Sequence, residues 1–149
     1  MPALEELLQR ARGLLFIGVG NVLKRDDGVG VVISRQIVER SGVRALTVEV
    51  SIENYIGKIN SLEPSEIVIV DCMELGCEPG AYKLLKLKDI EDLTFNTHNI
   101  SLGGLGDFFQ YPTYVLGIQP ESVAFGEKLS SPVRNSARQI ICLINQQNS

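Results

Sequence analysis

The chain has 149 residues, of which 44% are hydrophobic and 21% charged, with a formal net charge of −4. This balance lacks the basic excess of a nucleic-acid-binding protein, and no apolar run reaches the roughly 18 residues that a membrane span needs. We therefore expect one domain over residues 1–149, a cytoplasmic monomer, with neither nucleic acid nor membrane as a partner. The acidic N-terminal segment does not resemble a signal peptide.

Apolar periodicity predicts the elements of the first half of the chain. In order, they are a helix over 3–11, a strand over 14–19, a helix over 29–40, a strand over 43–50 and a helix over 54–62. Asp26 and Asp27 then lie in the loop or first turn that precedes the second helix. The glycines on both sides of them allow the backbone to approach closely.

The second half continues the alternation. Its elements are strands over 65–73 and 81–87, a short helix from Ser101 to about residue 110, a strand over 113–118 and a final helix. We expect Ser131 to cap that helix and Pro132 to occupy its first position. An apolar stripe then follows along it, formed by Val133, Ala137, Ile140, Ile141 and Ile144. Strands alternating with helices indicate an α/β domain with a mostly parallel sheet.

The clearest strand carries "IVIV" over residues 67–70, which is typical of a central parallel strand buried on both faces. Asp71 follows at its carboxyl end. Ligand sites in open α/β sheets lie beyond the carboxyl ends of the strands, so Asp71 and the acidic pair Asp26–Asp27 could converge there.

The stretch "GVGNVLKRDDGVG" (18–30) raises the possibility of a phosphate-binding loop, which the residues disfavour. Leu23 stands where the dinucleotide fingerprint requires its third glycine, and the neighbouring aspartates would repel an anion. A cation site fits better. Asp71, one of the adjacent aspartates, and His98, the only histidine of the chain, suit a divalent transition metal.

Each member of this set also has a structural interpretation. An aspartate at a helix start can be a cap, an aspartate ending a strand can be a turn residue, and a loop histidine can be solvated. Adjacent side chains tend to diverge, so we do not expect Asp26 and Asp27 both to be ligands. The other one could bind backbone N–H groups and hold the loop.

The three cysteines, Cys72, Cys77 and Cys142, form no CxxC pair, which argues against a disulfide framework or a zinc ribbon. We expect them to be small core or subsurface residues. Cys72 in particular should point into the core, away from the side of Asp71. No serine or cysteine nucleophile with a neighbouring base is evident, and neither GxSxG nor HExxH occurs.

Four ordered motifs, "GVGNVLKRDDGVG", "IVIVDCMELGCEPG", "THNISL" and "LGIQPE", together resemble the hydrogenase maturation endopeptidases. The resemblance is closest to the type that processes the hydrogenase 3 large subunit. It implies a three-layer α/β/α sandwich with a twisted, mostly parallel sheet of about five strands. It also implies three metal-binding and catalytic residues, Asp27, Asp71 and His98, with Asp26 shaping the loop.

The function implied by the resemblance is removal of the C-terminal extension from a NiFe-hydrogenase large-subunit precursor after nickel insertion. Nickel is then supplied by the precursor, although another divalent transition metal could occupy the site. The segment 48–56, which begins "VEVSIENY", departs from the glycine- and proline-containing pattern of many relatives, in a region thought to help recognise the precursor. This departure motivates an alternative, a nickel-recognition chaperone that does not cleave. A nucleotide-binding domain is a weaker alternative.

Overall fold

The computed structural model describes residues 4–91, 97, 99–100 and 105–146. Its α-helices are α1 (Leu4–Arg10), α2 (Val29–Arg35), α3 (Ile56–Ser61), α4 (Leu87–Glu91) and α5 (Ser131–Gln146). Its strands are β1 (Leu14–Val19), β2 (Val43–Glu49), β3 (Glu66–Cys72), β4 (Tyr82–Lys86) and β5 (Thr113–Ile118). Short 3-10 turns, labelled η1 to η3, cover Arg25–Gly28, Ile52–Tyr55 and Leu105–Asp107.

The five strands form one sheet in the order β2-β1-β3-β5-β4, with β3 at its centre. Strands β1, β2, β3 and β5 pair in parallel, and only β4 runs antiparallel, against β5. Every residue of β3 is buried, which confirms the interpretation of "IVIV" as a central strand. The mostly parallel five-stranded sheet of the predicted fold class is therefore confirmed.

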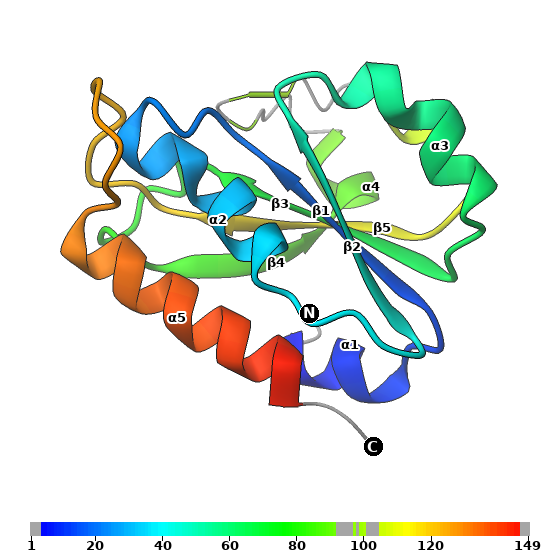
Figure 1. The fold of residues 1–149 in the computed structure, drawn as a ribbon. Coiled ribbons are helices and arrows are strands. Elements are labelled where there is room, and N and C mark those ends of the chain that lie inside the picture. Colours follow the sequence, from blue (N-terminus) through cyan, green and yellow to red (C-terminus); the bar gives the residue numbers. More distant parts are fainter. Residues whose placement is uncertain (1–3, 92–96, 98, 101–104, 147–149) are drawn as a thin grey trace.

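Helices cover both faces of the sheet, as Figure 1 shows. On one face α1, α2 and α5 pack against alternate strand residues such as Phe16, Val68 and Leu116. On the other face α3 and α4 cover the intervening residues, among them Ile17, Ile69 and Val115. The period-two alternation of side chains across the sheet thus divides the apolar residues into two cores and gives three layers.

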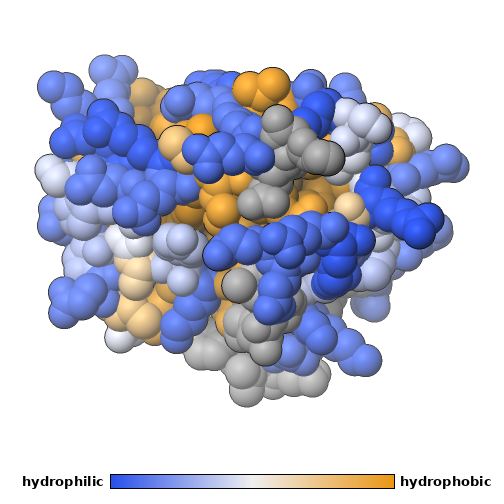
Figure 2. Space-filling view, turned by 90° about the horizontal axis from the view of Figure 1, so that it is seen from below, coloured by the Kyte–Doolittle hydropathy of each residue, from blue (hydrophilic) through white to orange (hydrophobic). Residues whose placement is uncertain are grey.

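Helix α5 lies on the same face of the sheet as α1 and α2, and it contributes the predicted apolar stripe. Val133, Ala137, Ile140 and Ile144 are buried, while Ile141 packs partly against the same core. Figure 2 looks onto the face that bears α1 and α5, where apolar groups in the middle are surrounded by hydrophilic side chains. Among the described residues, no helix combines the length and apolarity needed to cross a membrane.

The helix predicted over 29–40 is too long, since α2 ends at Arg35. Beyond it the chain turns towards β2. The Val38 N–H donates to Asn145 Oδ1 of α5 at 2.9 Å instead of to a helical carbonyl, and Arg40 forms an isolated antiparallel β-bridge with Val43. Val38 is 62% exposed, so its apolar spacing did not reflect a buried helical face. Tertiary hydrogen bonds therefore end this helix before its sequence pattern does.

Other helices also differ from the prediction. The segment 54–62 begins as the turn η2 and becomes helical only at Ile56. Helix α5 begins one residue earlier than expected, because the Ser130 carbonyl accepts the Arg134 N–H at 2.8 Å and makes Ser130 the cap. Within the predicted helix up to residue 110, the described part contains only η3, and Ser101 lies outside the described residues.

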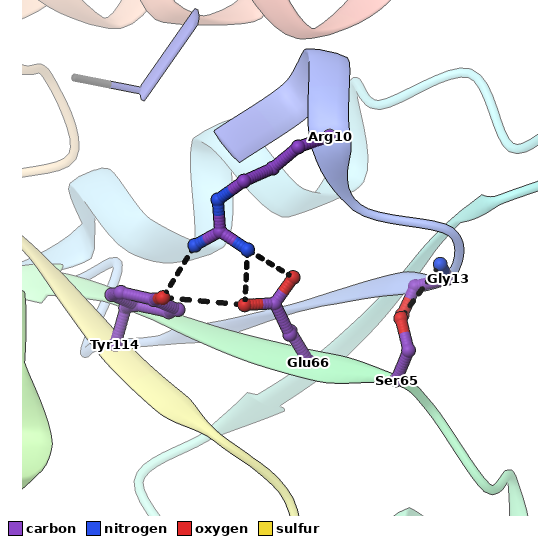
Figure 3. A network of polar contacts seen from close by, with 5 residues as sticks. All are labelled: Arg10, Gly13, Ser65, Glu66 and Tyr114. Atoms are coloured by element: carbon purple, nitrogen blue, oxygen red, sulfur yellow. Dashed lines mark hydrogen bonds and ion pairs between the residues drawn. The ribbon is translucent and has the colours of Figure 1, made fainter. Parts of the chain in front are cut away.

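A polar network joins α1 to the amino-terminal ends of β3 and β5 (Figure 3). Arg10 Nη1 donates to Glu66 Oε1 at 3.1 Å and Oε2 at 3.3 Å, and Arg10 Nη2 donates to the Tyr114 hydroxyl at 2.7 Å. The Tyr114 hydroxyl in turn donates to Glu66 Oε1 at 3.2 Å. This network gives the buried Glu66 carboxylate a cation and a hydroxyl as partners.

Candidate functional site

Two aspartates meet beyond the carboxyl ends of adjacent parallel strands. Asp27 lies in η1, which follows β1, and Asp71 is the penultimate residue of β3. Asn99 Nδ2 donates to Asp27 Oδ1 at 3.1 Å and to Asp71 Oδ1 at 2.8 Å. The predicted convergence of an aspartate from the acidic pair with Asp71 is therefore confirmed.

Asp71 is fully buried, and only one of its carboxylate oxygens is well supplied with donors. Oδ1 accepts the Cys72 N–H at 2.7 Å in addition to the Asn99 amide. Oδ2 is buried and has no partner among the described residues within hydrogen-bonding geometry, although the Thr97 hydroxyl lies near enough to lower the pKa of Asp71. Burial raises the pKa of Asp71 to about 8, against the lowering effects of Thr97, Asn99 and the Cys72 N–H, and the nearby Asp27 charge raises it further.

Asp27 is 4% exposed, and its two oxygens face different partners. Oδ2 accepts the Asn21 N–H at 3.2 Å, which ties Asp27 to the start of its own loop, while Oδ1 faces Asn99. A loop backbone donor thus orients the Asp27 carboxylate towards Asp71.

Asp26 points away from Asp27 and holds the loop that follows β5. Its Oδ2 accepts the N–H groups of Glu121 at 2.9 Å and Ser122 at 3.1 Å. Ser130 supplies its N–H to Oδ1 and its hydroxyl to Oδ2, both at 2.7 Å. Asp26 therefore has the loop-holding role expected for one member of the pair. In Figure 1 this loop and the loop after β1 lie side by side.

The glycines around the acidic pair serve close packing of backbone segments. A Cβ on Gly30 would collide with the carbonyl oxygens of Val19 and Val70, so this glycine lets α2 sit directly on β1 and β3. Gly20 has a φ of +153°, and a Cβ there would collide with the Asp27 carbonyl oxygen. These close approaches, rather than a phosphate, account for the glycine pattern.

His98 lies outside the described residues, so its assignment as the third ligand stays a prediction. Within the part of the chain that the structure describes, no three side chains of His, Cys, Asp or Glu gather closely enough to hold a metal. The described pair Asp27 and Asp71 lacks a third such ligand of its own, and the neighbours of His98 in sequence, Thr97 and Asn99, lie at this pair.

Cys72 is buried on the opposite face of β3 from Asp71, in the core beneath α2 and α5. Burial, followed by the charge of Asp71, raises the pKa of the Cys72 thiol. The prediction that Cys72 points into the core is confirmed. Cys77 is half-buried as expected, but Cys142 is exposed because it lies outside the apolar stripe of α5.

A cavity of about 290 Å³ opens next to Asn99. Its walls include Val50, Ile52, Glu53 and Ile56 from the atypical segment, and Asn99 lies on its other side. Residues of the segment 48–56 therefore share a cavity wall with the residue that bridges the two aspartates.

A second cavity, of about 470 Å³, lies between the end of β3 and the edge strand β4. Apolar side chains line most of it, among them Met73, Leu75, Leu85 and Ile90. Met73 follows Asp71 by two residues and packs in the same core layer, so this cavity begins on the Asp71 side of the sheet.

Sequence reasoning did not identify Asn99 as part of the site. It lies next to the predicted ligand His98 in a polar loop, which was the only available signal. Its role depends on the two carboxylates being close enough to share one amide group, and this distance is set by tertiary structure.

The chain is similar to a known protein family in both sequence and fold. The family model described as HycI, hydrogenase maturation protease, matches residues 50–147, which include Asp71 and Asn99. The hydrogenase 3 maturation protease of Escherichia coli K12 is 27% identical over 132 residues, covering 85% of each chain.

Solved structures show the same fold. The crystal structure of a NiFe-hydrogenase maturation protease, HycI from Thermococcus kodakarensis KOD1, superposes with a TM-score of 0.83 at 25% identity, covering 97% of both chains. The hydrogenase maturating endopeptidase HybD from Escherichia coli superposes with a TM-score of 0.70 at 21% identity, covering 90% of this chain and 88% of HybD. The predicted α/β architecture is therefore confirmed.

Proposed function

Because the chain belongs to the hydrogenase maturation protease family and is therefore a peptidase, we propose that it trims a NiFe-hydrogenase large-subunit precursor. It removes the C-terminal extension after nickel has been inserted. The nickel arrives as part of the substrate, and Asp27, Asp71 and His98 recognise it. Peptide cleavage thus follows only when the metal centre of the precursor is loaded.

The observation that carries this proposal is the convergence of Asp27 and Asp71 on one amide group, with Asp71 Oδ2 left without a described partner. Two like-charged carboxylates side by side in a buried place are unfavourable without a compensating positive charge. A divalent cation supplies that charge. The other buried carboxylate of β3, Glu66, has such a charge in Arg10.

The donor types fit nickel. Carboxylate oxygens from Asp27 and Asp71 and an imidazole nitrogen from His98 form a mixed oxygen–nitrogen set of the kind that binds divalent transition metals. Three protein ligands leave further coordination positions to the precursor's own ligands. The buried, unpartnered Oδ2 of Asp71 is available as a ligand atom without breaking a hydrogen bond to the described residues.

For cleavage, the protein must hold the scissile peptide near this centre and accept a proton. Water adds to the peptide carbonyl carbon, the carbon–nitrogen bond breaks, and the proton released by water passes to the leaving amine. In this proposal a carboxylate of the Asp27–Asp71 pair relays that proton. Binding of the substrate nickel by the same residues sets the distance between peptide and carboxylate.

Two cavities, one next to Asn99 and one next to the end of β3, offer space for an extended peptide. The one lined by Val50, Ile52 and Ile56 adjoins Asn99, and the one that begins at Met73 adjoins the end of β3. Apolar side chains of the precursor next to the scissile bond fit such walls. The atypical segment then contributes directly to the choice of precursor.

The test is cleavage of candidate large-subunit precursors, loaded with nickel or free of it, followed by mass spectrometry of the C-terminus. We expect loss of one defined C-terminal peptide from the nickel-loaded precursor alone. Tight, nickel-dependent binding with an intact C-terminus would contradict the proteolytic proposal and favour the chaperone. Equal cleavage of both forms would contradict nickel recognition.

A further inference from the structure

We propose that Asn99 is a positioning residue that holds Asp27 and Asp71 in place while no cation is bound, and that it withdraws when a cation arrives. The inference rests on the metal site of the proposed function. It adds a residue that family resemblance did not assign, and it describes how the metal-free site is kept ready.

The geometry of Asn99 matches this role. Its amide nitrogen carries two hydrogens, and the two short contacts to Asp27 Oδ1 and Asp71 Oδ1 use one each. The lone pair of a neutral amide NH2 nitrogen is delocalised into the carbonyl group and is not available to a metal. While both hydrogens point at the carboxylates, Asn99 therefore occupies the place of a cation between them without being a ligand.

The amide compensates the two acids only in part. It is neutral overall, and a hydrogen bond from a neutral donor stabilises a buried carboxylate less than an ion does. Asp71 is accordingly left with one oxygen without a described partner. A divalent cation interacts more strongly with both carboxylates, so it displaces the amide rather than adding to it.

The surroundings of Asn99 allow its side chain to move while its backbone stays. Its N–H donates to Thr97 Oγ1 at 3.2 Å, and the same oxygen accepts the Ile100 N–H at 2.8 Å. These bonds fix the backbone of the turn. The side chain lies at the wall of the 290 Å³ cavity, which has room to receive it when it leaves the carboxylates.

A thermodynamic consequence distinguishes this role from a purely structural one. If the cation displaces Asn99, the hydrogen bonds of Asn99 stabilise only the metal-free protein and oppose metal binding. Removing the amide then destabilises the metal-free protein and tightens metal binding by the same factor. For the loss of two hydrogen bonds, we expect about tenfold tighter binding or more.

The experiment compares the wild-type protein with Asn99→Ala, using Ni²⁺ alone as the probe. Isothermal titration measures the Kd, and denaturant unfolding with and without Ni²⁺ measures stability. Asn54→Ala is a matched control, because Asn54 is exposed and takes part in no described side-chain hydrogen bond. Asn99→Asp is a second variant that keeps the size of the side chain and adds a carboxylate.

We expect Asn99→Ala to unfold more easily than wild type without Ni²⁺, to bind Ni²⁺ about tenfold more tightly, and to match wild type in saturating Ni²⁺. Asn99→Asp should bind Ni²⁺ still more tightly and be the least stable without it. Asn54→Ala should behave as wild type in both measurements.

Three results would overturn the inference. Equal destabilisation of Asn99→Ala with and without Ni²⁺ would make Asn99 a structural residue. Weaker Ni²⁺ binding by Asn99→Ala would make it a ligand. Absence of Ni²⁺ binding by every protein would also contradict this inference, whereas recognition of nickel held in the precursor is tested separately by the cleavage assay.

Discussion

The two ends of β3 each bury a carboxylate, and they treat it differently. At the start of the strand, Glu66 receives Arg10 and Tyr114 as partners on the α1 side of the sheet (Figure 3). At the end, on the opposite side, Asp71 receives an amide and a backbone N–H, retains an oxygen without a described partner, and lies near a second acid.

This difference separates a carboxylate that stabilises the fold from one that is kept for a ligand. The partners of Glu66 compensate its charge within the chain, so this carboxylate needs no ligand from outside the protein. Asp71 lacks a described cation, and its environment favours the protonated form until a positive charge arrives. Substitutions at the first end should therefore change stability, and those at the second should change function.

The largest expected effect is the loss of cleavage in Asp71→Asn. The amide preserves the shape of the side chain but removes a charged ligand, so we expect nickel-dependent precursor cleavage to fall by about 100-fold or more. Glu66→Gln is the matched control at the other end of the strand. The Glu66→Gln variant should cleave at the wild-type rate under conditions where it is folded. An equal loss of cleavage in both variants would contradict the separate roles of Glu66 in stability and Asp71 in function.

The second effect is on the pH dependence of stability. The pKa of Asp71 is raised from 3.8 to about 8 on folding, so between these values the native state holds a proton that the unfolded state releases. Protonation of Asp71 therefore makes its full contribution to the free energy of unfolding below about pH 4, and this contribution is lost as the pH rises towards 8. The total loss is on the order of a few kcal/mol.

Denaturant unfolding of wild type and Asp71→Asn at pH 5, 7 and 9 checks this effect without added metal. The stability difference in favour of the variant should grow with pH and level off above about 8. A difference that does not change with pH would mean that the Asp71 carboxylate is not perturbed by its burial.

A third, smaller effect concerns Asp26, which is buried next to Asp27 but fully supplied with donors. In Asp26→Asn, an NH2 group would face an N–H or hydroxyl donor from Glu121, Ser122 or Ser130. We expect a loss of about 2–3 kcal/mol in the free energy of unfolding. The Kd for Ni²⁺ should change far less than in Asp71→Asn, and a comparable loss of metal binding would make Asp26 a ligand.

The smallest effect is expected for Arg10→Met. The Arg10 side chain is half exposed, so solvent already screens its ion pair with Glu66, and Tyr114 remains as a donor. We expect a loss of about 1 kcal/mol in the free energy of unfolding and an unchanged cleavage rate. Calorimetry and the precursor assay check the two parts, and a loss of cleavage here would show that both ends of β3 serve the reaction.

Much of the fold could be predicted because local pattern and tertiary structure agree. The four β-branched residues at 67–70 can be satisfied only by a strand buried on both faces, and the alternation of strands and helices then indicates a mostly parallel sheet. Where a distant contact decides the outcome, the prediction was wrong. The end of α2 depends on Asn145 of α5, and the start of α5 depends on Asp26 holding Ser130.

The site could be predicted in part for the same reason. Strand ends identify Asp71 and the acidic pair, but only the family resemblance distinguished Asp27 from Asp26, since their divergence depends on the loop after β5. Asn99 was missed because a bridging amide has no sequence pattern of its own. His98 stays a prediction, as do the single domain, the monomeric state and the cytoplasmic location.

Anomalous diffraction from crystals of the protein grown with Ni²⁺ tests the central claim most directly. The account predicts one strong nickel peak in contact with carboxylate oxygens of Asp27 and Asp71 and with His98, with the Asn99 amide turned away from both. A peak elsewhere, or a Ni²⁺-treated protein in which Asn99 still bridges the two carboxylates, would contradict it.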